Sequence, residues 1–289
     1  TAAESALANN DLDASLALAA RVEALEPEVE TITKVRLLQA EANLWRNNPA
    51  AVQQAEEILS LAPPASRTWY RAAAGVLFLA GQVADLSRLV SVVARLEADP
   101  HRADDRPTAS MQIMAYSMAA WLLASIGVRE RARGFIERAL DLDSRGLADE
   151  TAQGWLGIGR HYIARYDEGN PWRALTSARA AYERFSSMGD VRLTVLAQII
   201  EALTLIELGA PGEALAIFER VMTTCDLVDL QAARGDAKRW QAGALAALGR
   251  TDEAIVIARA ALAETRSELT FGAAAQTTLA ALLLQSGRV

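Results

Sequence analysis

The sequence predicts an all-α protein: a right-handed superhelix, or α-solenoid, of about seven antiparallel helix pairs followed by a lone C-terminal helix. Three observations support this prediction. A phrase of glycine followed five residues later by alanine recurs, clearest at 208–215 and 248–255. Alanine, the best helix former, is the commonest residue. No stretch shows the polar and apolar alternation of a half-buried strand.

The recurring alanine sets the period of the array. It falls at Ala132, Ala174, Ala214 and Ala254, in steps of 42, 40 and 40 residues. A fixed period of this size is typical of stacked like units, each burying its apolar face against its neighbours. We therefore expect a single solenoid over 1–289. The start without methionine and the stop just after a repeat glycine suggest a fragment of a larger, multidomain signalling protein.

The last complete unit illustrates how two helices arise. Gly249 is expected to close the helix at 237–248, because glycine accepts the left-handed conformation common at helix C-termini. Asp252 is expected to cap the next helix, 253–265, by accepting from its free amide hydrogens. Ala254 begins an i, i+4, i+7 alanine face, so the two helices are expected to approach closely there.

Caps, glycines and prolines place the other helices in the same way. Acidic residues at 11 and 13 precede the first of them, and Asn-Asn-Pro at 47–49 replaces a glycine turn. A polar loop is expected at 99–107 and a lengthened turn at 166–171. The expected helices cover 14–27, 50–61, 68–80, 83–98, 107–126, 129–141, 150–164, 172–185, 192–208 and 211–224, with the lone helix at 269–285.

Composition narrows the functional classes. The net charge is −7 with both signs interspersed, whereas nucleic-acid binding needs a positive stripe, so no direct nucleic-acid contact is expected. No apolar run approaches the ~18 residues of a membrane helix, so no membrane contact is expected. Cys225 is the only cysteine and cannot form an internal disulfide, which favours a reducing, cytoplasmic location.

No group of residues has the spacing of a catalytic or metal site. His101 and His161 are the only histidines, and neither has a zinc-ligand partner nearby in sequence. Cys225 lacks a basic neighbour that would lower its pKa. The glycines of GWLGIG at 154–159 fall inside an expected helix, not in the strand-to-helix turn of a dinucleotide site. We expect no enzyme activity, no cofactor and no metal.

One unit carries a family pattern. Trp155, Gly159 and Tyr162 have the W-x2-L-G-x2-Y spacing of tetratricopeptide repeats, and Ala214 and Phe218 match its later alanine and aromatic positions. The period of about 40 exceeds the 34 of that family. This long-period form resembles the helical sensor regions of bacterial ATP-dependent LuxR-type activators and the arrays linked to bacterial serine/threonine kinases.

The resemblance implies a binding surface. In tetratricopeptide-like stacks the first helices of successive pairs line the concave side. Arginine offers a forked set of donors to carboxylates, and tryptophan is a common interface anchor. Alignment on the small residue at the tight helix contact places on this groove Arg71, Trp121, Gln153, Arg160 and Arg239, extended by Lys34 and Glu41.

Two functions remain open from the sequence. The first is a non-catalytic protein–protein, peptide-binding or scaffold module of a bacterial signalling or regulatory protein, with a protein or peptide segment in the concave groove. The second is the small-molecule inducer-sensing domain of a LuxR-type transcription activator. The first predicts an open, arginine-bearing groove, and the second predicts a deep aromatic pocket near 155–172. No feature indicates an oligomeric state.

Overall fold

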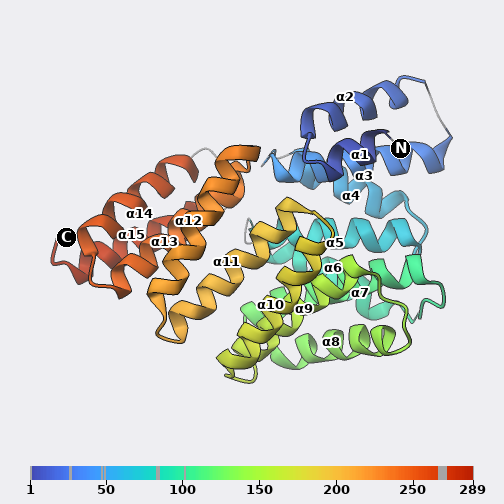
Figure 1. The fold of residues 1–289 in the computed structure, drawn as a ribbon. Helices are drawn as coiled ribbons and strands as arrows, with labels where there is room; N and C mark the ends of the chain where they lie inside the picture. Colours follow the sequence, from blue (N-terminus) through green and yellow to red (C-terminus); the bar gives the residue numbers. More distant parts are fainter. Residues whose placement is uncertain are drawn as a thin grey trace. The chain divides into compact units, whose positions relative to one another are not determined.

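The computed structural model describes residues 2–25, 28–46, 48, 50–82, 85–100, 102–265 and 272–288. Within these ranges the chain forms helices and no strand (Figure 1). The prediction of an all-α fold is confirmed. The helices are α1 (Ala2–Ala8), α2 (Leu12–Glu23), α3 (Val29–Trp45), α4 (Ala50–Leu61), α5 (Arg67–Gln82), α6 (Leu86–Ala98), α7 (Arg106–Ser125), α8 (Arg129–Ser144), α9 (Glu150–Tyr166), α10 (Pro171–Ser187), α11 (Val191–Glu207), α12 (Pro211–Val228), α13 (Gln231–Ala247), α14 (Thr251–Thr265) and α15 (Gly272–Gln285).

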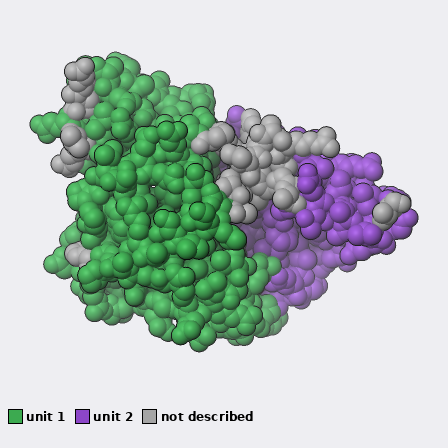
Figure 2. Space-filling model, turned by 180° about the vertical axis from the view of Figure 1, so that it is seen from behind, with its two compact units in different colours: residues 1–190 green, residues 191–289 purple. Residues whose placement is uncertain are grey.

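The chain divides into two compact units, Thr1–Asp190 and Val191–Val289 (Figure 2). In unit 1 each first helix packs against its own second helix and against the next first helix, as α7 does with α8 and α9. In unit 2 the same order joins α11 with α12 and α13 with α14. This is the packing of stacked helix pairs, as predicted. A single array across both units stays a prediction.

Several helices end at a glycine of the repeat phrase. Gly127, Gly209 and Gly249 have φ values of 81°, 78° and 76°, in the left-handed region that closes a helix. Gly81 has the same place in an earlier copy of the phrase, Ala80 to Ser87, which predicts a turn there, and that prediction is wrong. It lies inside α5, where a Cβ would be 2.4 Å from Cδ2 of Leu122. This glycine allows α5 and α7 to approach closely.

The connection between α12 and α13 also differs from the prediction. The expected helices stopped at 224 and resumed at 237, yet α12 continues to Val228 and α13 begins at Gln231. Asp229 adopts a left-handed φ of 53°, and the Leu230 N–H donates to the Cys225 carbonyl at 3.0 Å. Leu230 is buried, so tertiary packing fixes this short reversal.

Other boundaries shift less. Helix α14 begins at Thr251, so Asp252 lies in its first turn, where it pairs with Arg288 at 2.5 Å instead of capping the helix. Asp85 caps α6 by accepting from the Arg88 N–H at 3.0 Å. The predicted starts at 83 and 269, and His101 in the predicted loop, lie outside the described residues. Helices α1 and α3 had no predicted bounds.

The glycines of α9 are packing positions, as the sequence predicted. A Cβ at Gly157 would lie 3.1 Å from the Ser177 carbonyl oxygen, and one at Gly159 would lie 3.2 Å from Cα of Ser117. A Cβ at Gly154 would lie 2.3–2.8 Å from three ring atoms of Phe185. Helix α9 therefore approaches both α7 and α10 closely.

Replacing Gly154 with alanine is expected to destabilise unit 1 by about 1–3 kcal/mol, because the fully buried Phe185 ring must move. That cost outweighs the ~1 kcal/mol gained in helix propensity. Gly134→Ala in α8 is the matched control, since a Cβ there meets nothing within 4 Å and should stabilise slightly. Urea denaturation followed by circular dichroism measures both. Equal stabilisation by the two alanines would contradict the close α9–α10 packing.

Candidate functional site

Six aromatic side chains of unit 1 form a connected string across four first helices. Each ring contacts at least one other member, and the members come from α3, α5, α7 and α9. These helices pack in order, α3 on α5, α5 on α7 and α7 on α9, which brings the rings together. The aromatic string consists of Trp45, Phe78, Trp121, Trp155, Tyr162 and Tyr166.

Phe78 is the centre of the string. Its ring centroid lies 5.9 Å from that of Trp45 and 6.0 Å from that of Trp121. A third contact, at 6.2 Å, joins it to Trp155. Tilted and edge-on contacts at these distances are favourable for aromatic quadrupoles. The α5 ring therefore connects three other first helices.

Tyr162 extends the string along α9. It stacks on Trp121 with a centroid distance of 5.0 Å and an interplanar angle of 20°, and on Tyr166 at 5.9 Å and 27°. The Arg165 guanidinium lies 4.6 Å from the Tyr166 ring centroid. The string thus ends at Tyr166, whose ring is in cation–π contact with Arg165.

The outer members of the string reach the surface. Trp45 and Trp121 are half-buried, and Tyr166 is 36% exposed. The other three rings are buried beneath them. Partly exposed tryptophan and tyrosine on a rigid base are the usual anchors of protein interfaces.

Of the five predicted site residues, Trp121 belongs to this string and Arg71 lies beside it. Arg71 precedes Phe78 by seven residues, which places both on one face of α5. Its Nη2 lies 2.6 Å from Oε2 of Glu41, and this carboxylate raises the pKa of the guanidinium. Lys34 is exposed on α3. The charge of Arg71 is therefore already compensated within the protein.

Gln153 and Arg160 lie on another side of α9. Each is two residues from a string member, about 200° around the helix. They line a small cavity of about 240 Å³ together with residues of α10. Gln153 Nε2 donates to Oδ1 of Asp143 at 3.3 Å. The structure therefore brings these two residues together, but away from Trp121.

Arg239 belongs to unit 2. Its Nη2 lies 2.5 Å from Oδ1 of Asp236, and its guanidinium stacks 4.0 Å from the Trp240 ring centroid. Both contacts are local, within α13. Arg239 therefore has its contacts within unit 2, and in unit 1 Gln153 and Arg160 lie on another side of α9 from the string that contains Trp121.

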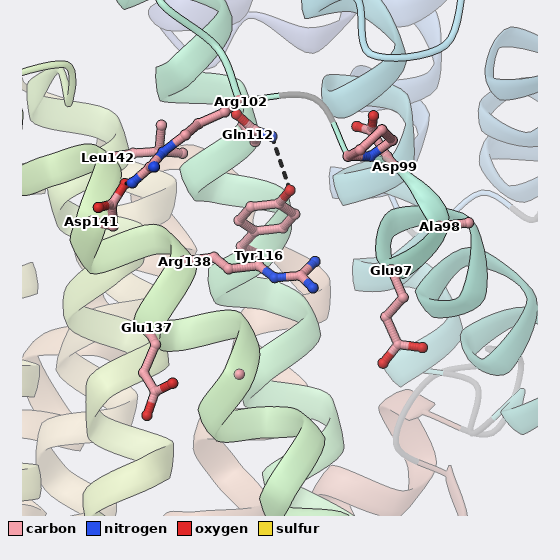
Figure 3. A pocket seen from close by; sticks show the side chains of 12 residues that line it. Glu97, Ala98, Asp99, Arg102, Gln112, Tyr116, Glu137, Arg138, Asp141 and Leu142 are labelled. Atoms are coloured by element: carbon pink, nitrogen blue, oxygen red, sulfur yellow. Dashed lines mark hydrogen bonds and ion pairs between the residues drawn. The ribbon is translucent and has the colours of Figure 1, made fainter.

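A larger cavity of about 730 Å³ lies between α6, α7 and α8 (Figure 3). The sequence prediction missed it, because most of its residues come from second helices and from the loop between α6 and α7. The lining residues are Glu97, Ala98, Asp99, Pro100, Arg102, Gln112, Tyr116, Gly134, Glu137, Arg138, Asp141 and Leu142.

His161 and Cys225 are both buried and neutral. Burial lowers the pKa of His161 to about 4, and its Nδ1 lies 3.1 Å from the Ala174 carbonyl oxygen, to which it donates as a neutral ring. Burial raises the pKa of the Cys225 thiol to about 12, so it is not a thiolate at neutral pH. Over the described ranges, no group of three or more His, Cys, Asp or Glu residues could hold a metal ion.

Among the described helices, none combines the length and the apolar character needed to cross a membrane.

Comparison with known proteins shows similarity in structure but not in sequence. No protein-family model matches the chain, and no curated protein matches it. A signal transduction ATPase with a tetratricopeptide repeat sensor from Pyrococcus horikoshii is 14% identical, with a TM-score of 0.55 over 87% of this chain. The chain spans only 43% of that protein.

A second solved structure is similar over more of its length. A Rap protein complexed with competence and sporulation factor is 14% identical, with a TM-score of 0.61 over 99% of this chain and 85% of that one. At such identity the likeness concerns the fold. The chain has a tetratricopeptide-like helical-repeat fold, as the Trp155, Gly159 and Tyr162 pattern indicated.

Proposed function

We propose that the chain is a non-catalytic interaction module of a bacterial signalling or regulatory protein, and that it binds a peptide or an extended protein segment. The aromatic string of unit 1 is the proposed contact surface. The observation that carries this proposal is the set of three outer rings, Trp45, Trp121 and Tyr166, packed against buried rings on α5 and α9.

The energetics favour such a surface. Binding costs free energy to order mobile side chains, but rings already packed against each other lose little freedom. Trp and Tyr bury large areas and dominate interface affinity. The four ring-to-ring steps from Trp45 to Tyr166 are 5.0–6.0 Å each, a path that an extended segment of about seven residues would follow at ~3.3 Å per residue.

The polar neighbours suggest the chemistry of the partner. The Arg71–Glu41 pair lies beside the string and offers one donor and one acceptor without a net charge. A partner segment with aromatic or aliphatic side chains and few charges fits this surface best. The Rap protein and the tetratricopeptide sensor share the fold, which supports an interaction role. The inert His161 and Cys225 supply no nucleophile or base at neutral pH.

The alternative of an inducer sensor predicted a deep aromatic pocket near 155–172. The cavity found beside α9 measures about 240 Å³ and is lined mainly by small and polar residues such as Gln153 and Ser177. Small-molecule sites are usually ~300–1,000 Å³ and mostly apolar. The rings of Trp155, Tyr162 and Tyr166 belong to the string instead, which favours the interaction module.

Selection from a random-peptide phage library, followed by affinity measurement, tests this proposal. We expect selected peptides to bind the parent protein and to bind Trp121→Ala about 10–100-fold more weakly, as for an interface anchor. Trp172→Ala is the matched control, because Trp172 is 67% exposed and outside the string. A library that yields no binder, or binders unaffected by Trp121→Ala in a folded protein, would overturn the proposal.

A further inference from the structure

The cavity between α6, α7 and α8 has the size of a small-ligand site, at about 730 Å³. Its floor is α7, with Gln112 and Tyr116, and its walls are the end of α6 and one face of α8. Gly134 adds no side chain to the α8 wall, and a Cβ there would meet nothing within 4 Å. The cavity is separate from the aromatic string, with which it shares no residue.

Most charges of the lining are compensated within the protein. Glu97 accepts from Nε and Nη2 of Arg131, both at 2.7 Å. Asp141 pairs with Arg102 at the other wall. These carboxylates therefore need no ligand cation.

A buried network fixes the floor. Gln112 Nε2 donates to Tyr70 Oη at 2.8 Å and to Tyr116 Oη at 2.9 Å, and its Oε1 accepts from the Ala103 N–H at 3.1 Å. Tyr70 in turn donates its hydroxyl hydrogen to Asp99 at 2.5 Å. The Gln112 amide group is thus held at both its nitrogen and its oxygen. The Tyr116 hydroxyl is held in one place.

Tyr116 keeps a donor for the cavity. Its oxygen accepts from Gln112 Nε2 at 2.9 Å, and Arg138 lines the same cavity. Among the described residues nothing accepts its hydroxyl hydrogen. Burial raises the pKa of Tyr116, so the hydrogen is present at neutral pH. The floor therefore offers one fixed O–H donor.

Arg138 supplies a forked donor beside it. Its guanidinium lies 5.8 Å from the Phe135 ring centroid and has no carboxylate partner within the described ranges. Figure 3 shows its side chain extending from α8 toward the middle of the cavity, below the Tyr116 ring. The neighbouring Glu137 likewise has no cationic partner in the described part of the chain.

We propose that this cavity binds an α-carboxylate, taken by the Arg138 guanidinium and the Tyr116 hydroxyl; where the ligand is a free short peptide, its ammonium group is placed near Glu137. An arginine fork matches the two oxygens of a carboxylate, and a second neutral donor completes the contact. The carboxylate belongs either to a free short peptide or to the C-terminal end of a longer chain. This is a second site, independent of the aromatic string.

Titration of the ¹⁵N-labelled protein with free trialanine tests the site, with its C-terminal amide as the matched probe. We expect saturable shifts of the amide signals of residues 134–142 with trialanine and none with the amide. Arg138→Gln should weaken binding about 10–100-fold, and Tyr116→Phe should weaken it less. Arg145→Gln, an exposed arginine at the end of the same helix, should bind as the parent does.

A longer peptide ending in the same three alanines identifies the source of the carboxylate. Binding equal to that of trialanine assigns the cavity to chain ends, and binding of trialanine alone assigns it to free peptides. Trp121→Ala should leave both results unchanged, which separates this site from the aromatic string. No saturable shift at roughly 10 mM probe, equal binding of acid and amide, or full binding by a folded Arg138→Gln variant would overturn the proposal.

Discussion

Replacing Trp155 with alanine is expected to lower the free energy of unfolding of unit 1 by about 3–5 kcal/mol. The side chain is 4% exposed, and its ring lies 6.2 Å from Phe78 and 5.9 Å from Phe185. Truncation removes both ring contacts and leaves a cavity that close-packed helices fill only in part. Urea denaturation followed by circular dichroism measures the loss.

Trp172→Ala provides the comparison for Trp155. It removes the same side chain from a position that is 67% exposed in the first turn of α10, so a change below about 0.5 kcal/mol is expected. Similar losses for the two variants would mean that the Trp155 ring is not the packed centre between Phe78 and Phe185.

Ala254→Leu is expected to destabilise unit 2 by about 1–3 kcal/mol. Ala254 is 0% exposed and lies in the buried cluster between α13 and α14, with Leu245 and Ile255. A leucine there must displace one helix, because the alanine marks the tight contact of the repeat. A thermal melt of the purified protein measures the effect.

Ala216→Leu is the matched substitution on an exposed position of α12 in the same unit. It should leave the melting temperature nearly unchanged. Unchanged melting of Ala254→Leu as well would contradict the register in which the repeated alanine faces the partner helix.

The architecture could be predicted because its signals are local. Gly249 ends a helix through its own backbone freedom, and Ala254 marks a contact between neighbouring helices. The reversal at Asp229 could not be predicted in this way. A non-glycine residue with positive φ is uncommon, and here the buried Leu230 holds it in place.

The candidate site could be predicted only in part. The resemblance placed Trp121 on the binding side, and the structure puts it in the aromatic string. The Asp236–Arg239 pair was readable from its i, i+3 spacing. The Glu41–Arg71 pair joins residues 30 positions apart, so only the stacking of α3 on α5 reveals that the arginine is compensated.

The cavity beside α8 had no sequence signal. Gln112 joins Tyr70, 42 positions away, with Tyr116, four positions away. Of these two tyrosines, only Tyr116 is a neighbour of Gln112 on the same helix. A polar network of this kind depends on how successive pairs stack, which the repeat period does not specify in atomic detail.

The indole N–H signals of the tryptophans test the central claim most directly, because the chain has six and each gives one resonance. A phage-selected peptide would be titrated into ¹⁵N-labelled protein with the signals assigned by single Trp→Phe variants. We predict saturable shifts of Trp45 and Trp121, with Trp172 and Trp240 unchanged. Shifts confined to Trp172 or Trp240 would contradict the assignment of partner binding to the aromatic string.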